Sequence, residues 1–362
     1  MATTGILPRQ AIAALIEGGV IAAEAPFTDD QLQPASLDLR LGAVAHRIRA
    51  SFLPGRGGDL AKKLAALTLH TIDLSRGAVL ETGCVYLVPL LERLALPKGL
   101  AATANPKSST GRLDIFTRVI ADGAGGFDRV PAGYAGPLFV EISPRTFPVL
   151  VRTGSRLGQL RLRRGETRLT DIELAALHAR EPLVQPGEAL IADGLNVSID
   201  LASALAGGRV GYRAKRHTGV IDVDRRDGYE VADFWEPIAA SPDRGLILDP
   251  DEFYILVSRE AVQVPPETAA EMVPFDPLVG EFRVHYAGFF DPGFGHGALG
   301  AGARAVLEVR SREVPFILEH GQVVARLVYE RMAATPDRLY GHGIASNYQA
   351  QSLKLSKHFR GG

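Results

Sequence analysis

The segment Asn105–Arg112, with the sequence Asn-Pro-Lys-Ser-Ser-Thr-Gly-Arg, gathers several chemically active side chains within eight positions. Lys107 supplies a point charge and Arg112 a planar fork of donors, and the hydroxyl groups and loop amides between them add further donors. Such a set suits an anion that carries several oxygen atoms. Glu141 follows 29 residues after Arg112 in Leu-Phe-Val-Glu-Ile, a β-type run in which a carboxylate interrupts apolar residues. A carboxylate among apolar neighbours suits a group that takes up and releases protons.

Both features also have a plainer interpretation. Clusters of Ser, Thr, Gly and Lys are common in polar turns, and a glutamate in a strand commonly faces solvent. Composition alone leaves both interpretations open, so the order of further motifs along the chain has to decide between them.

The motif Lys-Ser-Ser-x-x-Arg followed by a strand glutamate resembles the dCTP deaminase family, whose members are relatives of the trimeric dUTPases. Four further segments resemble the family in the same order, namely Gln33–Gly42, Tyr86–Pro89, the turn at Leu96-Pro97, and Gly154–Leu160. Together these segments cover most of residues 5–165. The resemblance implies a dUTPase-like β fold and an enzyme of pyrimidine deoxynucleotide synthesis that deaminates dCTP by hydrolysis to dUTP and ammonia.

Composition and charge limit the partners of the chain. The sequence has 362 residues, of which 46% are hydrophobic and 22% are charged, as in an ordinary soluble protein. A net charge of −1 gives no general attraction to nucleic acid or to an anionic membrane. No apolar run approaches a membrane span of about 18 residues, and the N-terminus lacks a signal-peptide layout. We therefore expect a cytoplasmic protein with neither a nucleic-acid nor a membrane partner.

Cys84 is the single cysteine of the sequence. It excludes an internal disulfide framework. It also excludes the usual zinc deaminase site, which combines His-x-Glu with Pro-Cys-x-x-Cys. If the chain deaminates a base, we expect it to do so without zinc. We expect Mg²⁺ to be bound by the oxygens of the triphosphate rather than by protein side chains.

The pattern of the first half predicts a short helix followed by a β domain. Leu7–Gly19 reads as the helix, with Pro8 at its start and Gly18-Gly19 at its end. From about residue 35 to 165, short Val, Leu and Ile runs alternate with Gly, Pro and Asp turns, which is typical of an all-β sandwich or barrel. The basic tract Arg161–Arg164 closes this part, and we expect it to be exposed.

The same pattern then starts again, which indicates a duplication. Thr170–Glu173 is a capping box that opens a second helix, and Asn196–Leu201 resembles Pro34–Leu39. Four identities recur at a constant offset of 167, where Glu141, Pro148, Gly154 and Leu160 return as Glu308, Pro315, Gly321 and Leu327. We therefore predict a mainly β protein with two tandem dUTPase-like β-barrel or sandwich domains, each opened by a short helix. The domains are expected at 1–166 and 167–332, before a tail at 333–362.

The two copies differ at the residues that carry chemistry. In place of Lys107–Arg112 the second copy has Phe275–Glu281, which holds two acids and no cation and would repel a triphosphate. Conversely, Asp291–Gly295 resembles the family's turn that holds the deoxyribose, whereas the first copy has Pro131–Gly136 there and lacks the aspartate. This resemblance implies sugar contacts from Asp291, Gly293 and Phe294.

The tail carries one further resemblance. Ser346–Gln351 is similar to the family's polar C-terminal segment, which folds over bound nucleotide. This implies that the tail acts as a lid and that Tyr348 and Gln351 contact the substrate. The alternative is a frayed terminus.

The resemblance also implies roles within the site. We expect Glu141 to take a proton from water and pass protons to the ring nitrogen and the leaving amine, and Ser108 and Arg112 to stabilise charge on the base. Lys107 and Ser109 then bind phosphate. Because the family's sites lie between neighbouring β domains, we expect a homo-oligomer with threefold or pseudo-threefold packing of domains.

Alternatives stay open for the base and for the function. Glu308 replaces Glu141 as the base if unlike copies meet and Asp291 with Glu308 completes a composite site above the first copy's loop. The chain could also be a dUTPase-type or bifunctional hydrolase that releases dUMP and pyrophosphate, or a regulator that binds nucleotide without catalysis. Release of ammonia separates the deaminase from the other functions, and release of pyrophosphate identifies the hydrolase.

Overall fold

The computed structural model describes residues 3–55, 58–185, 188–202, 208–274, 282–285, 288–296, 302–311, 313–341 and 352–361. The chain forms two compact units, which are described separately. The first consists of Met1–Thr167, His217–Gly228 and Met332–Asp337, and the second of Arg168–Arg216, Tyr229–Arg331 and Arg338–Gly362. Two short segments beyond the expected boundary thus belong to the first unit. The expected domain boundaries at 166/167 and 332/333 stay a prediction.

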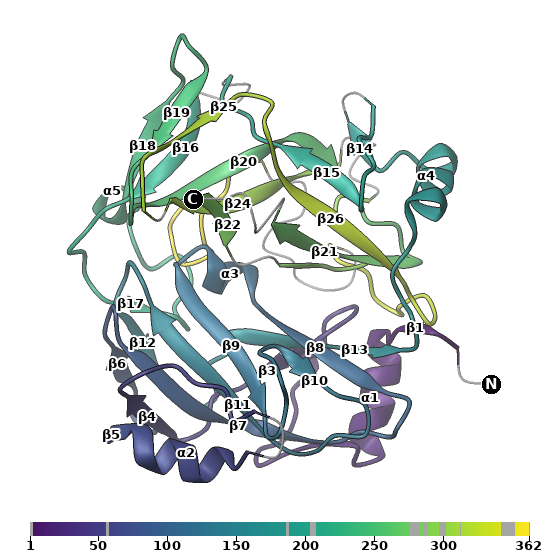
Figure 1. Ribbon diagram of the computed structural model, residues 1–362, viewed down its shortest axis with the longest axis vertical. Coiled ribbons are helices and arrows are strands. Elements are labelled where there is room, and N and C mark those ends of the chain that lie inside the picture. The colour runs from purple at the N-terminus through teal and green to yellow at the C-terminus, as the bar shows by residue number, and fades with distance from the viewer. Residues whose placement is uncertain are drawn as a thin grey trace. The chain divides into compact units, whose positions relative to one another are not determined.

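The first unit is built from three β-sheets (Figure 1). The largest has the order β5-β4-β7-β11-β9, with β2 also paired with β7; its strands are β2 (Ile21–Ala23), β4 (Val44–Ile48), β5 (Thr68–Asp73), β7 (Val85–Ala95), β9 (Ile115–Ala121) and β11 (Ala135–Pro144). The second has the order β1-β13-β8-β10, with β3 also paired with β13; its strands are β1 (Gly5–Ile6), β3 (Leu37–Leu39), β8 (Ala101–Pro106), β10 (Arg129–Val130) and β13 (Gly158–Arg164). The third joins β6 (Ala78–Leu80), β12 (Val149–Val151) and β17 (Ile221–Asp222).

The second unit repeats this strand order. Its largest sheet has the order β18-β16-β20-β24-β22, with β14 paired with β20; the strands are β14 (Val184–Gln185), β16 (Arg209–Ala214), β18 (Trp235–Ala239), β20 (Phe253–Val262), β22 (Phe282–His285) and β24 (Ala303–Ser311). The second sheet has the order β15-β26-β21-β23, with strands β15 (Leu195–Ser198), β21 (Thr268–Pro274), β23 (Phe289–Phe290) and β26 (Val323–Arg331). The third joins β19 (Gly245–Leu248) and β25 (Phe316–Glu319).

Strand register confirms the predicted pair of mainly β domains with one fold. Glu141 pairs with Leu87 on one side, and Glu308 pairs with Ile255 in the same position of the other copy. The predicted match of Asn196–Leu201 with Pro34–Leu39 is wrong, however. Leu160 pairs with Leu37 and its counterpart Leu327 pairs with Leu195, so Asn196 corresponds to Asp38.

A short helix opens each copy, as predicted. α1 (Arg9–Glu17) begins after Pro8 and ends at Gly18, and Gly19 follows with a φ of 72°, a value that glycine adopts readily. α4 (Asp171–Arg180) has the predicted capping box, in which the Thr170 N–H donates to Glu173 at 2.8 Å and the Glu173 N–H donates back to the Thr170 hydroxyl at 3.3 Å.

Further helical turns interrupt the β pattern. They are the 3₁₀ turn η1 (Asp29–Gln31) and the helices α2 (Leu60–Leu67), α3 (Ser108–Gly111) and α5 (Val231–Phe234). The prediction missed α2, whose Asp59 side chain caps the Lys62 N–H at 3.0 Å. Leu60 and Leu64 of α2 are buried in a cluster with Ile48, Leu87 and Ile120, so α2 covers one face of the largest sheet of the first unit.

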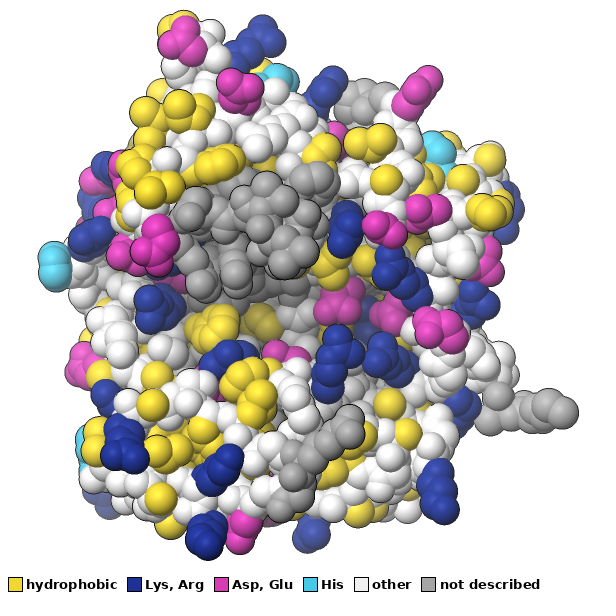
Figure 2. All heavy atoms as spheres, in the orientation of Figure 1, with side chains coloured by type: hydrophobic (Ala, Val, Ile, Leu, Met, Phe, Trp, Pro, Cys, Tyr) yellow, Lys and Arg dark blue, Asp and Glu magenta, His cyan; other side chains and the backbone are white. Residues whose placement is uncertain are grey.

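The basic tract Arg161–Arg164 is partly buried. Arg161 is 0% exposed, so the expectation that the whole tract Arg161–Arg164 is exposed was wrong. Figure 2 shows Lys and Arg side chains interspersed with Asp and Glu on the face drawn, in keeping with the net charge of −1. Within the described part of the chain, no helix has the length and apolar character needed to cross a bilayer.

Candidate active site

Glu141 lies within β11, in a row of residues that runs across the largest sheet of the first unit. Its backbone pairs with Leu87 of β7 and with Arg118 of β9. Because directly opposed residues share one face of a sheet, all three side chains point the same way. Glu141 is 1% exposed, so the plainer interpretation of a solvent-facing strand glutamate is wrong.

Arg118 is the partner of this carboxylate. Its Nε donates to Glu141 Oε1 at 3.0 Å, and its Nη2 donates to the same oxygen. The guanidinium carbon lies 3.6 Å from the ring centroid of Phe127 and 4.7 Å from that of Phe116, and Nη2 also donates to the Ser51 hydroxyl at 2.7 Å. The neighbours of Glu141 are therefore not purely apolar, because a cation stands opposite it.

The second oxygen of Glu141 has a different environment. Oε2 is buried and accepts no hydrogen bond from the residues that the structure describes. Buried polar atoms in proteins nearly always have a partner, and an exception in a native site calls for an explanation such as a ligand or an ordered water. One carboxylate oxygen is thus held and the other is open to a further hydrogen bond.

Apolar side chains and one histidine complete this face. Leu87 belongs to the apolar cluster under α2, and Phe127 and Phe139 pack against the same cluster. His46 of β4 pairs with Leu87 and so lies in the same row as Glu141, beyond one intervening strand. Burial lowers the pKa of His46 below its usual value of 6.5, which favours the neutral imidazole near neutral pH.

The loop of the predicted motif folds into α3. The N–H groups of Thr110 and Gly111 donate to the Lys107 carbonyl at 2.8 and 3.0 Å. Ser109 and Arg112 are 6% and 3% exposed, whereas Lys107 and Ser108 are half-buried. Lys107 and Ser108 are therefore partly accessible to solvent, whereas Ser109 and Arg112 are buried.

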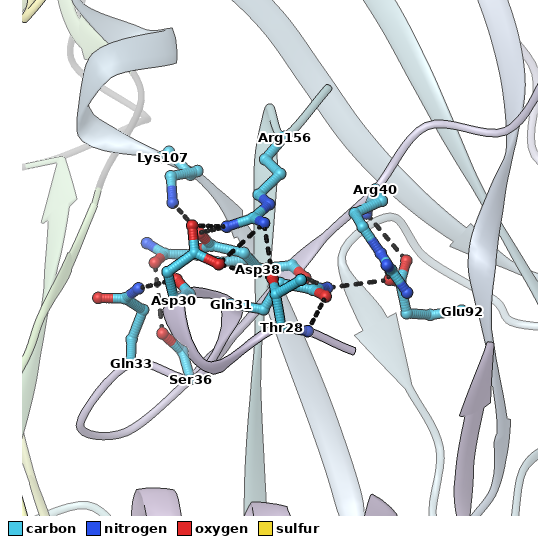
Figure 3. Close-up of polar contacts among 11 residues, drawn as sticks. Thr28, Asp30, Gln31, Gln33, Ser36, Asp38, Arg40, Glu92, Lys107 and Arg156 are labelled. Carbon is cyan, nitrogen blue, oxygen red and sulfur yellow. Dashed lines mark hydrogen bonds and ion pairs between the residues drawn. The ribbon is translucent and has the colours of Figure 1, made fainter. Parts of the chain in front are cut away.

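Lys107 already has a counter-ion within its own unit. Its ammonium group donates to Oδ2 of Asp38, a residue that is 1% exposed (Figure 3). Nη1 of Arg156 lies 3.9 Å from the same oxygen and donates to Asp30 at 2.9 Å. Nη2 of Arg156 also donates to Asp30, at 3.1 Å, and the hydrogen bonds from Arg156 to Asp30 hold the pKa of Asp30 at about 2, below its usual value of 3.8. A phosphate that binds Lys107 must share the ammonium group with Asp38.

A second buried pair fixes the strand that carries Asp38. Glu92 is 0% exposed, and its two oxygens accept hydrogen bonds at 2.8 Å from the backbone N–H and from Nε of Arg40 (Figure 3). Gln31 donates to Glu92 at 3.2 Å and to the Asp38 carbonyl at 3.1 Å. This network positions the segment from Gln31 to Arg40, which belongs to the motif that resembles the family's early strand.

The second copy places its candidate residues in equivalent positions. Glu308 is 5% exposed, and its backbone pairs with His285, where the first copy has Arg118. The Val264 N–H donates to the Phe294 carbonyl at 2.8 Å, as the Leu96 N–H does to the Tyr134 carbonyl. Phe294 therefore corresponds to Tyr134.

Asp291 consequently corresponds to Pro131, as the sequence comparison assumed. Asp291 is 7% exposed, and Gly293 has a φ of 96° that suits the tight turn. The ring of Phe294 is buried 4.8 Å from Phe290 and 5.6 Å from Tyr340, so it packs in the core of the second unit. Substrate contacts of Asp291, Gly293 and Phe294 stay predictions, and Phe275–Glu281, Tyr348 and Gln351 lie outside the described residues.

The candidate residues of the first copy do not form one hydrogen-bonded cluster within the unit. Among the described residues, Arg118 alone donates to the Glu141 side chain, so Glu141 is hydrogen-bonded neither to Ser108 nor to Arg112. No three His, Cys, Asp or Glu residues gather as metal ligands within the described residues. The expectation about zinc stays a prediction.

Comparison with known proteins agrees with the family resemblance. The model of the 2′-deoxycytidine 5′-triphosphate deaminase N-terminal domain matches residues 3–166, and that of the C-terminal domain matches residues 170–359. A dCTP deaminase of Halorubrum lacusprofundi is 33% identical over 148 residues, which are 40% of this chain and 70% of that protein. A dUMP-forming dCTP deaminase of Mycobacterium sp. (strain KMS) is 33% identical over 165 residues, 44% of this chain and 80% of its own.

Similarity over most of the chain comes from a crystal structure. The 2′-deoxycytidine 5′-triphosphate deaminase of Agrobacterium tumefaciens is 63% identical, with a TM-score of 0.88 over 91% of this chain and 99% of that one. The resemblance drawn from the motifs is thereby confirmed, together with the fold. This chain belongs to the 2′-deoxycytidine 5′-triphosphate deaminase family.

Proposed function

We propose that this enzyme deaminates dCTP by hydrolysis to dUTP and ammonia, with Glu141 as the group that moves the protons. The observation that carries the proposal is the state of the Glu141 carboxylate. It is 1% exposed, Arg118 holds one of its oxygens, and the other accepts no hydrogen bond from the described residues. A buried carboxylate with one open oxygen suits a base that receives a proton from a bound water.

The chemistry then needs two proton transfers through one group. Water adds to C4 of the cytosine ring, its first proton goes to Glu141, and Glu141 passes that proton to the ring nitrogen N3. The new hydroxyl gives its proton through Glu141 to the amine, the C4–N bond breaks, and ammonia leaves as the C4 carbonyl forms. Such positioned acid–base transfer contributes about 10²–10⁴-fold to a rate.

Ser108 and Arg112 take the role of stabilising charge on the ring. Glu141 has its described hydrogen bonds from Arg118 alone, which supports a site in which Ser108 and Arg112 come from a neighbouring copy of the chain. We therefore propose a homo-oligomer with threefold or pseudo-threefold packing of β domains. Donors placed at the developing charge before the reaction starts are a large source of catalysis, because they need no reorganisation.

Lys107 and Ser109 are the proposed contacts of the triphosphate, with Mg²⁺ bound to the phosphate oxygens. Lys107 is half-buried, and Ser109, which is 6% exposed, lies in the first turn of α3. Mg²⁺ commonly keeps phosphates and waters as ligands, so it needs no cluster of protein carboxylates here. Asp38 lowers the net positive charge at Lys107 and repels the negatively charged triphosphate. Mg²⁺ bound to the phosphate oxygens offsets this repulsion. We place the enzyme in the cytoplasm, with no zinc at the base.

A second candidate function differs only in the product. The similar protein of Mycobacterium sp. (strain KMS) is a dUMP-forming dCTP deaminase, which favours an enzyme that also releases pyrophosphate. One assay decides between the two: dCTP and Mg²⁺ are supplied, and ammonia, dUTP, dUMP and pyrophosphate are quantified together. Ammonia with dUTP supports the first proposal, and ammonia with dUMP and pyrophosphate supports the second. Nucleotide binding without any product would contradict both.

A further inference from the structure

We propose that Arg118 is a positioning residue, which holds Oε1 of Glu141 and thereby assigns Oε2 to the reacting water. This inference rests on the proposed function, in which Glu141 moves the protons. The family motif Lys-Ser-Ser-x-x-Arg does not include Arg118, which lies six positions beyond its arginine in the next strand.

The contact between the two side chains is asymmetric. An arginine commonly meets a carboxylate with two parallel hydrogen bonds, one to each oxygen. Here both donors, Nε and Nη2, go to Oε1, while Oε2 is buried and accepts nothing from the described residues. A pair with one hydrogen bond to each oxygen would occupy both oxygens of the base. The arrangement seen here leaves Oε2 available to accept a proton.

The arginine itself is held from several sides. The ring of Phe127 lies against its guanidinium carbon at 3.6 Å, the ring of Phe116 lies at 4.7 Å, and the Ser51 hydroxyl accepts from Nη2 at 2.7 Å. The backbone register places Arg118 directly opposite Glu141 in the neighbouring strand. Stacking on an aromatic ring and a fixed strand position limit the rotation that would bring the fork to Oε2.

This arrangement has a consequence for the protons. Oε1 accepts two N–H donors, so a proton taken from water adds to Oε2, the oxygen that accepts no hydrogen bond from the described residues. The charged or titratable groups that the structure places in this row are Arg118 and, beyond Leu87, His46. Burial lowers the pKa of His46, so Arg118 is the constant positive charge beside the base. That charge lies directly beside the carboxylate that accepts the proton.

The test compares R118Q and R118K with the wild-type enzyme in steady-state kinetics of ammonia release across pH. We expect R118Q to lower kcat by about 10²-fold, the scale for a catalytic group displaced by about 1 Å, with KM for dCTP changed only a few-fold. The acid limb of its kcat profile should move to higher pH, because a positive charge beside the base is lost. R118K should restore the acid limb but only part of kcat, because a point charge replaces the fork.

Two control variants separate positioning from general stability. R213Q removes a half-buried Arg–Glu pair of the same cross-strand type, in which Arg213 Nη2 donates to Glu236 at 2.6 Å, and it should keep wild-type kcat. S51A removes one hydrogen bond from Arg118 while leaving its contact with Glu141, and it should lower kcat only slightly. Assembly and thermal stability are measured for every variant.

The outcomes distinguish a failure of the role of Arg118 from a failure of the role of Glu141. If E141Q abolishes ammonia release while R118Q keeps both wild-type kcat and the wild-type pH profile, the role of Arg118 is refuted and that of Glu141 stands. A fall in kcat and stability with an unchanged pH profile and no rescue by R118K indicates a structural arginine and also overturns the proposal. Full activity in E141Q refutes the proposed base, and the inference about Arg118 falls with it.

Discussion

Glu92 and Glu260 are equivalent residues of the two copies, and each binds the equivalent backbone N–H of its own copy. Glu92 accepts from the Arg40 N–H and Glu260 from the Ser198 N–H, both at 2.8 Å. Both copies have therefore kept a glutamate that accepts a hydrogen bond from the backbone of the early strand. The position opposite the candidate base has changed, from Arg118 to His285. This contrast supports the proposal that the base is Glu141 of the first copy, where an arginine is paired with it.

The two carboxylates should differ in their contribution to stability. Glu92 is 0% exposed and paired with the Arg40 guanidinium, whereas Glu260 is half-buried and bonds the neutral Ser198. Breaking a buried ion pair costs about 3–5 kcal/mol, and losing a neutral hydrogen bond costs about 1 kcal/mol. Urea unfolding of E92Q should therefore show a much lower midpoint than that of E260Q. Equal midpoints would mean that Arg40 finds another partner in the variant.

Stability in acid should depend on Asp30. Its pKa is lowered to about 2 in the folded chain from a usual value of 3.8, so ionised Asp30 stabilises the fold above pH 3.8. That contribution disappears as the pH falls through the window between 3.8 and about 2. The stability difference between wild type and D30N should be small, because the side chain is largely exposed, and should shrink within this window. A difference that grows as the pH falls would contradict the assigned ion pair with Arg156.

Lys107 should matter for binding more than for turnover. We expect K107Q to weaken dCTP binding by roughly 10-fold or more, since a hydrogen bond to a charged group is worth about 1.5–3 kcal/mol, and to lower kcat less. K62Q on α2 is the matched control, and titration calorimetry with dCTP and Mg²⁺ gives the affinities. Equal affinity of K107Q and K62Q would show that Asp38, rather than phosphate, is the only partner of this lysine.

Ammonia release should not depend on zinc. The sequence has one cysteine, and we expect the base to be attacked by water that a carboxylate activates. Treatment with a zinc chelator, followed by excess Mg²⁺, should leave the rate of ammonia release unchanged. Loss of activity that only added zinc restores would contradict the proposed mechanism.

The sequence allowed the duplicated β fold to be predicted because identities recur at one offset through strands that the structure pairs in the same register. The detailed match of Asn196–Leu201 failed for a physical reason. The correct register differs by four residues, an even number, which preserves the inward and outward alternation of a strand and so leaves the hydrophobic pattern equally satisfied.

Other features depended on contacts that one sequence does not reveal. The signals for α2 were present in Asp59 as an N-cap and in the spacing of Leu60, Leu64 and Leu67, but the surrounding β pattern outweighed them. Arg118 could be assigned to the same strand face as Phe116 and Ile120 by alternation. That Arg118 lies beside Glu141 on this face follows only from the pairing of β9 with β11. The burial of Arg161 likewise arises from tertiary packing.

The most direct test of this account compares E141Q with E308Q in ammonia release from dCTP, after both variants are shown to fold and assemble as the wild type does. Both glutamates occupy equivalent positions in β11 and β24, so the two substitutions are matched in place and in chemistry. We predict that E141Q lowers kcat by about 10²–10⁴-fold with little change in dCTP affinity, and that E308Q retains most of the activity. Loss of ammonia release in E308Q alone would contradict the assignment and establish Glu308 as the base.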